Sequence, residues 1–250
     1  MDVYRKIKIV KNRGSEYGEA DDDVAVERKI GIISDGMVLL SLSCTPSMIR
    51  ELVTGFLLTE NILPDAAAAS GVSIEYGEEI SVVLPANVTN SNTDLSRCLG
   101  GFTIGKKRET KRIIRDFLLQ AESLKGAFRD FQNRSELFRL TGCFHSAALS
   151  YGADIVAFAE DIGRHNAVDK VIGYAVLNDI TLGRGILLVS CRISSEIIAK
   201  CMRWDIPVIA SKAAPTDLSV RMAEESGMTL IGFLREDKMN IYAHPERIER

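Results

Sequence analysis

The second half of the sequence alternates between short apolar runs and amphipathic segments, and this alternation restricts the fold more than any other feature. From residue 136 onward, the runs DIVAFAED, GILLVSC, IPVIASK and TLIGFLRE predict strands. The segments between them, GRHNAVDKVIGYAVLND, SSEIIAKCMRWD and PTDLSVRMAEESG, predict helices. Repeated strand–helix units form a mostly parallel sheet with helices on both faces. The sequence therefore predicts an α/β domain over residues 106–250.

The first part of the sequence predicts a smaller α+β domain over residues 1–105. Strands are predicted at residues 3–10, 28–33, 37–43, 72–76 and 80–84. The run CTPSMIRELVTGFLLTEN predicts a helix with Thr45 as its N-cap. The polar run NVTNSNTDLSRCLGG ends this domain and predicts an exposed loop. After it, KKRETKRIIRDFLLQAESL predicts a helix with a basic start.

Composition excludes several classes of protein. A hydrophobic content of 46% and a charged content of 26% are ordinary for a globular protein, and a net charge of −3 argues against general nucleic-acid binding. No apolar run approaches the roughly 18–20 residues that a membrane span needs. The N-terminal residues lack the apolar centre of a signal peptide, so we expect a cytoplasmic protein. The five cysteines form no C-x-x-C pair and are expected to be thiols.

Polar residues gather where each predicted strand of the second half ends, in EDIGRHN, SCRISSE, SKAAPTD and FLREDK. In a parallel sheet these four corners share one edge, where ligands bind and where helix N-termini favour anions such as phosphate. Arg164, Arg192 and Arg235 bring positive charge to three corners, and His165 and Asn166 add hydrogen-bonding groups. Helix capping and a solvated helix face explain one such corner equally well. Four corners on one edge predict a binding site.

His145 raises the question of a metal site. Zinc nucleobase deaminases combine H-x-E with P-C-x-x-C on an α/β sheet. Here Ser146 and Ala147 follow His145, and Cys191 and Cys201 are too far apart to replace C-x-x-C. We therefore predict no metal site and place His145 near the start of a helix.

Cys98 differs from the other cysteines because it lies in the polar loop, beside Arg97 and before two glycines. Cys44, Cys191 and Cys201 fall in predicted strands or helices, where burial is expected. A sulfur-carrying cysteine needs access and a nearby cation that favours the thiolate. From the residues alone, a reactive thiol and a loop cysteine without a role are equally well supported; Cys143 either lines the predicted pocket or packs.

These motifs together resemble a known family. The segment EDIGRHNAVDK, with TGCFHSAAL before it and CRISSEIIAK and SKAAPTDLSVRMA after it, is similar to the FdhD family of formate dehydrogenase accessory sulfurtransferases. CTPSMIRELVTGFLLTENIL and GFLREDKMNIYAHPERI extend the resemblance over almost the whole chain. The resemblance implies a C-terminal three-layer α/β/α domain similar to cytidine deaminases, without their zinc site, and a homodimer.

The resemblance also implies a function. Family members receive sulfur as a persulfide from a cysteine desulfurase and pass it to molybdenum or tungsten bis(molybdopterin guanine dinucleotide), which then enters formate dehydrogenase. By resemblance Cys98 carries the sulfur, and a cofactor-binding stretch corresponds to Phe233, Leu234, Arg235, Glu236, Asp237 and Lys238. We add Arg164, His165, Asn166, Arg192 and His145 as predicted pocket residues, and expect GDP-like nucleotides to mimic part of the cofactor.

The chain departs from the family pattern at two points. Many members carry C-x-x-C in the loop, whereas Gly101 stands here in place of a second cysteine. The family's S-G-R is S-C-R here, so Cys191 replaces a glycine near the predicted pocket. The missing second cysteine leaves open a cofactor-binding chaperone without sulfur chemistry. A nucleotide-acting hydrolase or deaminase is a further alternative, and the absence of metal ligands argues against it.

Overall fold

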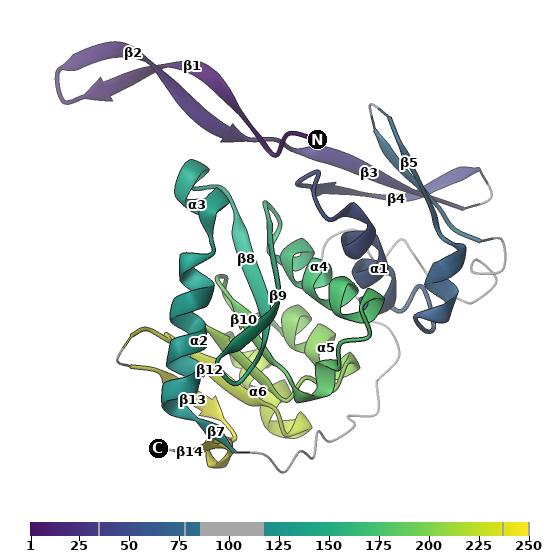
Figure 1. The fold of residues 1–250 in the computed structure, drawn as a ribbon, viewed down its shortest axis with the longest axis vertical. Coiled ribbons are helices and arrows are strands. Elements are labelled where there is room, and N and C mark those ends of the chain that lie inside the picture. Colours follow the sequence, from purple (N-terminus) through teal and green to yellow (C-terminus); the bar gives the residue numbers. More distant parts are fainter. Residues whose placement is uncertain (35, 78, 86–117, 237, 250) are drawn as a thin grey trace.

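A computed structural model describes residues 1–34, 36–77, 79–85, 118–236 and 238–249 (Figure 1). Its centre is a six-stranded sheet with the order β13-β12-β11-β10-β8-β9. The strands are β8 (His145–Tyr151), β9 (Asp154–Asp161), β10 (Ile186–Val189), β11 (Val208–Ser211), β12 (Thr229–Gly232) and β13 (Asn240–Ala243). The sheet is mixed, because β8 runs antiparallel to β10 and β9, and β13 runs antiparallel to β12.

The sheet nevertheless brings the four predicted corners to one edge. Strands β10, β11 and β12 are parallel, and β9 shares their direction because the antiparallel β8 lies between β9 and β10. The start of β8 lies at this edge too, where His145 is opposite Asp161. The expectation that His145 lies near a helix start was wrong. Its segment, HSAALSY, is a strand paired on both sides.

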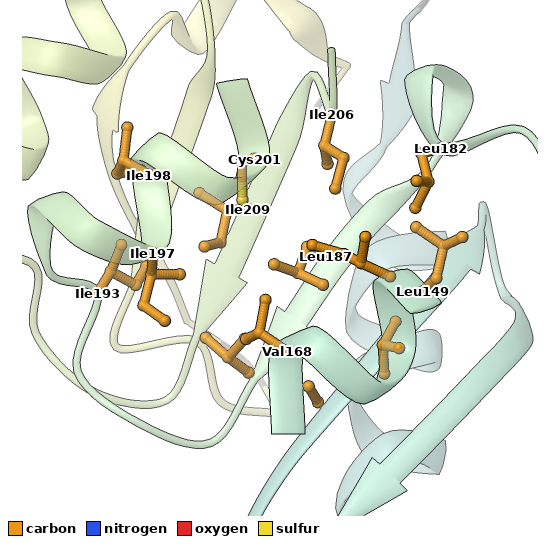
Figure 2. Close-up of a cluster of buried hydrophobic side chains, with 14 of the residues drawn as sticks. Leu149, Val168, Leu182, Leu187, Ile193, Ile197, Ile198, Cys201, Ile206 and Ile209 are labelled. Atoms are coloured by element: carbon orange, nitrogen blue, oxygen red, sulfur yellow. The ribbon is translucent and has the colours of Figure 1, made fainter. Parts of the chain in front are cut away.

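Helices cover both faces of the sheet, which gives three layers. On one face, α4 (Arg164–Leu177), α5 (Ser195–Arg203) and α6 (Asp217–Ser226) connect successive strands. Figure 2 shows Val168 of α4, Ile197 and Cys201 of α5, and Leu187 and Ile209 of the sheet in their shared core. On the other face, α2 (Ala121–Asn133) packs Phe128 and Phe131 against the sheet, and α3 (Glu136–Thr141) follows it.

Of the helix predicted from KKRETKRIIRDFLLQAESL, the part from Ala121 onward is helical among the described residues. Leu119–Gln120 forms the short strand β7, which pairs in parallel with β14 (Ile248–Glu249). The helix α2 starts only at Ala121, and residues 106–117 lie outside the described part of the chain. Two short 3₁₀ turns, Leu182–Arg184 and Pro245–Arg247, complete this half.

The N-terminal half contains a four-stranded sheet with the order β4-β3-β6-β5 and its own apolar core. Its elements are β3 (Arg28–Ser34), β4 (Met37–Cys44), α1 (Ile49–Thr59), the 3₁₀ turn Ala67–Gly71, β5 (Ser73–Tyr76) and β6 (Ile80–Val83). Before them, β1 (Tyr4–Arg13) and β2 (Glu16–Ala25) form a two-stranded ribbon that projects from the body (Figure 1). The sequence did not predict β2, because the run EADDD lacks the apolar alternation of a strand.

Two glycines let α1 of the N-terminal half pack directly on α4. A Cβ atom on Gly55 would lie 1.9 Å from the backbone oxygen of Asp169, and one on Gly173 would lie 1.9 Å from that of Glu51. The two helices therefore touch backbone to backbone. The domain boundary predicted between residues 105 and 106 lies outside the described residues. Among the helices described, none is long and apolar enough to span a bilayer.

Candidate anion site at the sheet edge

The sheet edge at which β9, β10, β11 and β12 end carries most of the predicted site residues. Arg164 and His165 begin α4, and Arg192 and Ser194 precede α5. Lys212 follows β11, and Phe233 follows β12. At about 4.8 Å per strand, the ends of β9 and β12 are roughly 19 Å apart. The edge is therefore long enough for an extended ligand rather than a single phosphate.

One half of the motif EDIGRHNAVDK faces the protein interior. The fully buried carboxylate of Asp161 accepts hydrogen bonds from the backbone N–H of Thr45 (3.1 Å), the backbone N–H of Gly163 (2.8 Å) and Nδ2 of Asn166 (2.9 Å). Its Oδ2 also lies 2.7 Å from Nζ of Lys170, which is fully buried as well. Asp161 therefore organises the corner from within and is not available to a ligand.

The same network joins the corner to the N-terminal half. Nζ of Lys170 donates to the carbonyl oxygen of Thr45 (3.3 Å), and Oγ1 of Thr45 accepts from the backbone N–H of Ile162 (3.1 Å). Thr45 was predicted as the N-cap of α1, and this was wrong. The N-cap is Met48, with a φ of 50°, and no described side chain caps the helix there. Thr45 is buried at the junction, where its polar groups bond to the corner residues and not to the start of the helix.

Asn166 also serves this junction. Its Nδ2 donates to the carbonyl oxygen of Ser43 (2.8 Å) and to Asp161, so both amide hydrogens are used inside the protein. Glu160 accepts from the backbone N–H groups of Leu137 and Phe138 (both 3.1 Å) and so holds the start of α3. Burial raises the pKa of Glu160, although these two amides act in the opposite direction.

A second buried cluster surrounds Lys200 of α5. Its Nζ donates to Asp169 (2.8 and 2.9 Å), to Glu60 (2.8 Å) and to Oγ1 of Thr59 (2.7 Å). Burial alone would lower the pKa of Lys200, but the carboxylates of Asp169 and Glu60 outweigh it and raise that pKa. The cluster is therefore ionised, and it links α1, α4 and α5.

Arg164 and His165 form the other half of the motif, and each has a buried nitrogen without a hydrogen bond among the described residues. Nε of Arg164 is buried and finds no hydrogen-bond acceptor in the part of the chain that the structure describes. Nε2 of His165 lies 2.7 Å from Oε2 of Glu196, but the two atoms are not aligned as a hydrogen bond. Buried polar groups usually have partners, so these two atoms point to a ligand that supplies them.

Both histidines at this edge are neutral at pH 7. Burial, with the charges of Lys200 and Arg164, lowers the pKa of His165 to about 4. Burial also lowers the pKa of His145, and the charges of Arg164 and Lys212 add to the effect. Burial is the larger cause in both cases, and the neighbouring cations that add to it favour an anionic ligand. Glu196 acts against such a ligand only when ionised, and burial raises its pKa.

The helix N-termini at this edge differ in how their backbone N–H groups are satisfied. The N-caps of α4 and α5 are Gly163 and Ser194, and neither helix has a side-chain cap from the residues described. The helix α6 is closed by a capping box between Thr216 and Ser219. The helices α4 and α5 therefore offer uncapped positive dipole ends, whereas in α6 the N–H of Ser219 already donates to Oγ1 of Thr216.

The segment after β12 is a tight turn at the far end of the edge. Phe233 has a φ of 51° and is 38% exposed, and its N–H donates to the carbonyl oxygen of Ala213 (3.2 Å). The N–H of Arg235 donates to the carbonyl oxygen of Lys238 (2.8 Å). Leu234 is buried in the core. Arg192 at the neighbouring corner, together with Arg235, Glu236 and Lys238, is exposed, and Asp237 lies outside the described residues.

Among the described cysteines, three are buried and one is exposed. Burial raises the pKa of Cys44 to about 12 and that of Cys191 to about 11, and it raises the pKa of Cys201 as well. These three thiols are therefore unreactive at neutral pH. Cys143 is exposed at the sheet edge, just before β8. Cys98, the predicted sulfur carrier, lies outside the described residues.

Sequence reasoning missed two residues of this edge. Nζ of Lys212 lies 5.0 Å from the centre of the Phe138 ring, so α3 reaches the corner after β11. Glu196 contacts His165 from the first turn of α5. The position of Lys212 in SKAAPTD was a usable signal for a basic residue at a strand end. Nothing in the sequence pairs Glu196 with His165, because that contact depends on how α4 and α5 lie on the sheet.

Known proteins resemble this chain over its full length. It is 31% identical to the sulfur carrier protein FdhD of Geobacillus kaustophilus over 96% of this chain and 95% of that protein. It is 34% identical to the sulfur carrier protein FdhD of Wolinella succinogenes over 99% and 91% of the two. A crystal structure of a candidate formate dehydrogenase accessory protein from Desulfotalea psychrophila matches with a TM-score of 0.79 at 26% identity, covering 99% of this chain and all of that one. The model of the FdhD/NarQ family matches residues 25–249. The chain therefore belongs to the FdhD/NarQ family.

Proposed function

We propose that this protein is a sulfur carrier for the maturation of formate dehydrogenase. Cys98 accepts persulfide sulfur from a cysteine desulfurase and passes it to molybdenum or tungsten bis(molybdopterin guanine dinucleotide), which is bound as a substrate at the sheet edge. In this proposal the protein is a cytoplasmic homodimer, and its C-terminal half shares the fold of cytidine deaminases.

Family membership and the names of the curated relatives support the sulfur-carrier role. The observation that carries the binding role is the group of unsatisfied polar atoms at Arg164 and His165, beside the uncapped starts of α4 and α5. A guanine dinucleotide brings phosphates to such an edge, and Arg164 can hold a phosphate oxygen through its guanidinium. The width of the edge, roughly 19 Å across four strand spacings, suits a dinucleotide that extends toward Phe233.

The sulfur step is tested by mass spectrometry after incubation with a cysteine desulfurase and cysteine. We expect the addition of one sulfur atom to Cys98, and loss of that adduct in Cys98→Ala. The matched control is Cys143→Ala, because Cys143 is the exposed cysteine of the described part of the chain. An adduct that persists in Cys98→Ala and disappears in Cys143→Ala would reject the assignment of Cys98.

The binding step is tested by calorimetric titration with GDP. We expect Arg164→Ala to weaken GDP binding at least about tenfold, since a hydrogen bond to a charged group contributes about 1.5–3 kcal/mol. The control is Arg221→Ala, which removes an exposed arginine of α6 that pairs only at the surface with Asp217. Equal GDP affinity in both variants would place the nucleotide elsewhere.

A chaperone that binds the cofactor without carrying sulfur is the second candidate. The sequence CLGG favours it, because Gly101 stands where many members have a second cysteine. This candidate predicts that Cys98→Ala still binds GDP and still supports formate dehydrogenase activity in cells that lack the wild-type protein. Loss of that activity with intact GDP binding supports sulfur transfer instead.

A further inference from the structure

Lys212 contacts an aromatic ring where a carboxylate would be the usual partner. It follows β11, it is half-buried, and its Nζ lies 5.0 Å from the centre of the Phe138 ring. Within the described part of the chain, no carboxylate pairs with it. A half-buried cation that has no counter-ion keeps its charge available to an anion that enters from solvent.

The contact between Lys212 and Phe138 runs along the sheet edge. Phe138 belongs to α3, and Glu160 at the end of β9 holds the start of α3 through the N–H groups of Leu137 and Phe138 (both 3.1 Å). The strand order β11-β10-β8-β9 puts Lys212 three strand spacings from Glu160, or roughly 14 Å at about 4.8 Å per spacing. The side chains of Lys212 and Phe138 therefore meet beside the end of β10 and the start of β8.

His145 shows that Lys212 and Arg164 act on the same region. His145 begins β8, which lies between the corner after β9 and the corner after β11. Burial lowers the pKa of His145, and the charges of Arg164 and Lys212 lower it further. The neutral imidazole adds no charge, so the two cations come from different strand ends toward one place. A ligand with two linked anionic groups satisfies both cations at once.

The ring of Phe138 restricts where Lys212 can point. Phe138 is 41% exposed, so it contributes less to the core than its size allows. The face of an aromatic ring attracts an ammonium group and favours the side-chain conformations that keep the two in contact. A lysine that is free in solvent loses rotamer freedom when it binds a ligand, and this loss costs affinity. Lys212 has lost part of that freedom before any ligand arrives.

We propose that Lys212 is a second phosphate-binding residue of the sheet edge, that Phe138 is its positioning residue, and that Lys212 and Arg164 together select a diphosphate over a monophosphate. The proposal rests on the nucleotide binding proposed above and specifies which part of the nucleotide the edge recognises. The two phosphates of a guanine dinucleotide are joined directly, so one ligand group meets both cations. A lysine and a phenylalanine that only cover α3 would have no effect on the choice of ligand.

The test is calorimetric titration of the full chain with GDP and with GMP. We expect the wild type to bind GDP more tightly than GMP. Lys212→Met should weaken GDP binding at least about tenfold and remove this preference, because the contact between ammonium and phosphate is charge-assisted. Lys212→Arg, which keeps the charge, should retain the preference. The control is Arg184→Met, which removes an exposed positive charge from the turn before β10, at the opposite end of the sheet, and should change neither affinity.

The outcomes separate this inference from the proposed function. If Lys212→Met keeps the preference for GDP while Arg164→Ala loses GDP affinity, the inference is overturned and the nucleotide site stands. If neither variant changes GDP affinity, the nucleotide lies elsewhere and both proposals fail. A wild type that binds GMP as tightly as GDP overturns the inference as well.

Two further variants test whether Phe138 positions Lys212. Phe138→Leu keeps an apolar side chain but loses the ring, and it should weaken GDP binding about two- to fivefold with GMP affinity unchanged. Phe138→Tyr keeps the ring and should bind both nucleotides as the wild type does. A purely structural role of Phe138 would change the affinities for GDP and GMP alike. Equal GDP affinity in Phe138→Leu and Phe138→Tyr would show that the ring does not position Lys212.

Discussion

Within the motif EDIGRHNAVDK, neighbouring residues serve different purposes. Asp161 and Lys170 are fully buried and satisfy each other and the chain around Thr45. Arg164 and His165, only three and four positions after Asp161, retain polar atoms without hydrogen-bond partners among the described residues. The motif therefore connects the two halves of the chain and also lines the candidate site. Substitutions within it are expected to fall into two classes.

The first class affects stability. Lys170→Met leaves the Asp161 carboxylate buried without its counter-ion, and we expect a loss of about 3–5 kcal/mol in the free energy of unfolding. The control, Arg221→Ala, breaks an ion pair whose side chains are 64% and 87% exposed, and should cost under about 0.5 kcal/mol. Urea denaturation followed by circular dichroism measures both. Similar small losses in the free energy of unfolding of the two variants would show that the buried ion pair does not hold the two halves together.

The second class affects pH dependence. The pKa of His165 is about 4 in the folded protein, below its usual value near 6.5, so the unfolded chain binds more protons between these pH values. The stability contributed by the neutral His165 side chain is therefore complete above about pH 6.5 and is lost as the pH falls toward 4. We expect the free energy of unfolding to fall less steeply over this range in His165→Gln than in the wild type. If the free energy of unfolding falls equally with pH in the two proteins, His165 is not held buried and neutral in the folded state.

Among the secondary-structure elements, α1 and α4 show how two halves of a chain are joined through small residues. Gly55 and Gly173 allow the helix backbones to touch, and the Lys200 cluster ties α5 to the same contact. Neither glycine has a positive φ, so it is close approach and not backbone strain that requires glycine at these positions.

Alanine at either position tests this contact. In Gly173→Ala the new Cβ meets the backbone oxygen of Glu51, which can give way only if the helices separate. We expect a loss of at least about 3 kcal/mol in the free energy of unfolding, in line with severe overpacking. The control is Gly126→Ala in α2, where a Cβ meets nothing within 4 Å and alanine should stabilise by about 0.5–1 kcal/mol. Equal changes in the free energy of unfolding would mean that the packing of α1 on α4 does not require this close approach of their backbones.

Across the whole molecule, the N-terminal core and the α/β core meet at Val176 and Trp204, which pack against both. Trp204, the sole tryptophan of the chain, packs against both apolar clusters. The Lys200–Glu60 ion pair, the glycine contacts and apolar packing all cross this junction, so the two halves should unfold together.

Cooperative unfolding gives a direct prediction. In urea, the transition of Trp204 fluorescence should coincide with that of far-ultraviolet circular dichroism, because one event removes both cores. In Gly173→Ala, which weakens the junction, the two transitions should separate. Separate transitions already in the wild type would show that the halves are independent.

Much of the α/β half followed from the sequence because its strands and helices have strong local patterns. The runs GILLVSC and IPVIASK are apolar enough to form a central sheet in any arrangement, and polar residues must then collect at their ends. The strand β8 was missed because HSAALSY lacks the β-branched residues that mark a strand. It is a strand because it fills the space between β9 and β10.

The sequence by itself determined the order of most strands and helices, the corner positions of Arg164, Arg192 and Arg235, and the resemblance that the family match confirmed. Only the tertiary structure decided which polar side chains of those corners remain available. Asp161, Asn166, Asp169 and Lys170 are used at the junction, whereas Arg164 and His165 are not. The physical reason is that periodicity and capping preferences act between near neighbours in sequence. The partner of a buried charge, such as Thr45 or Lys200, is set by packing between residues that are distant in the chain.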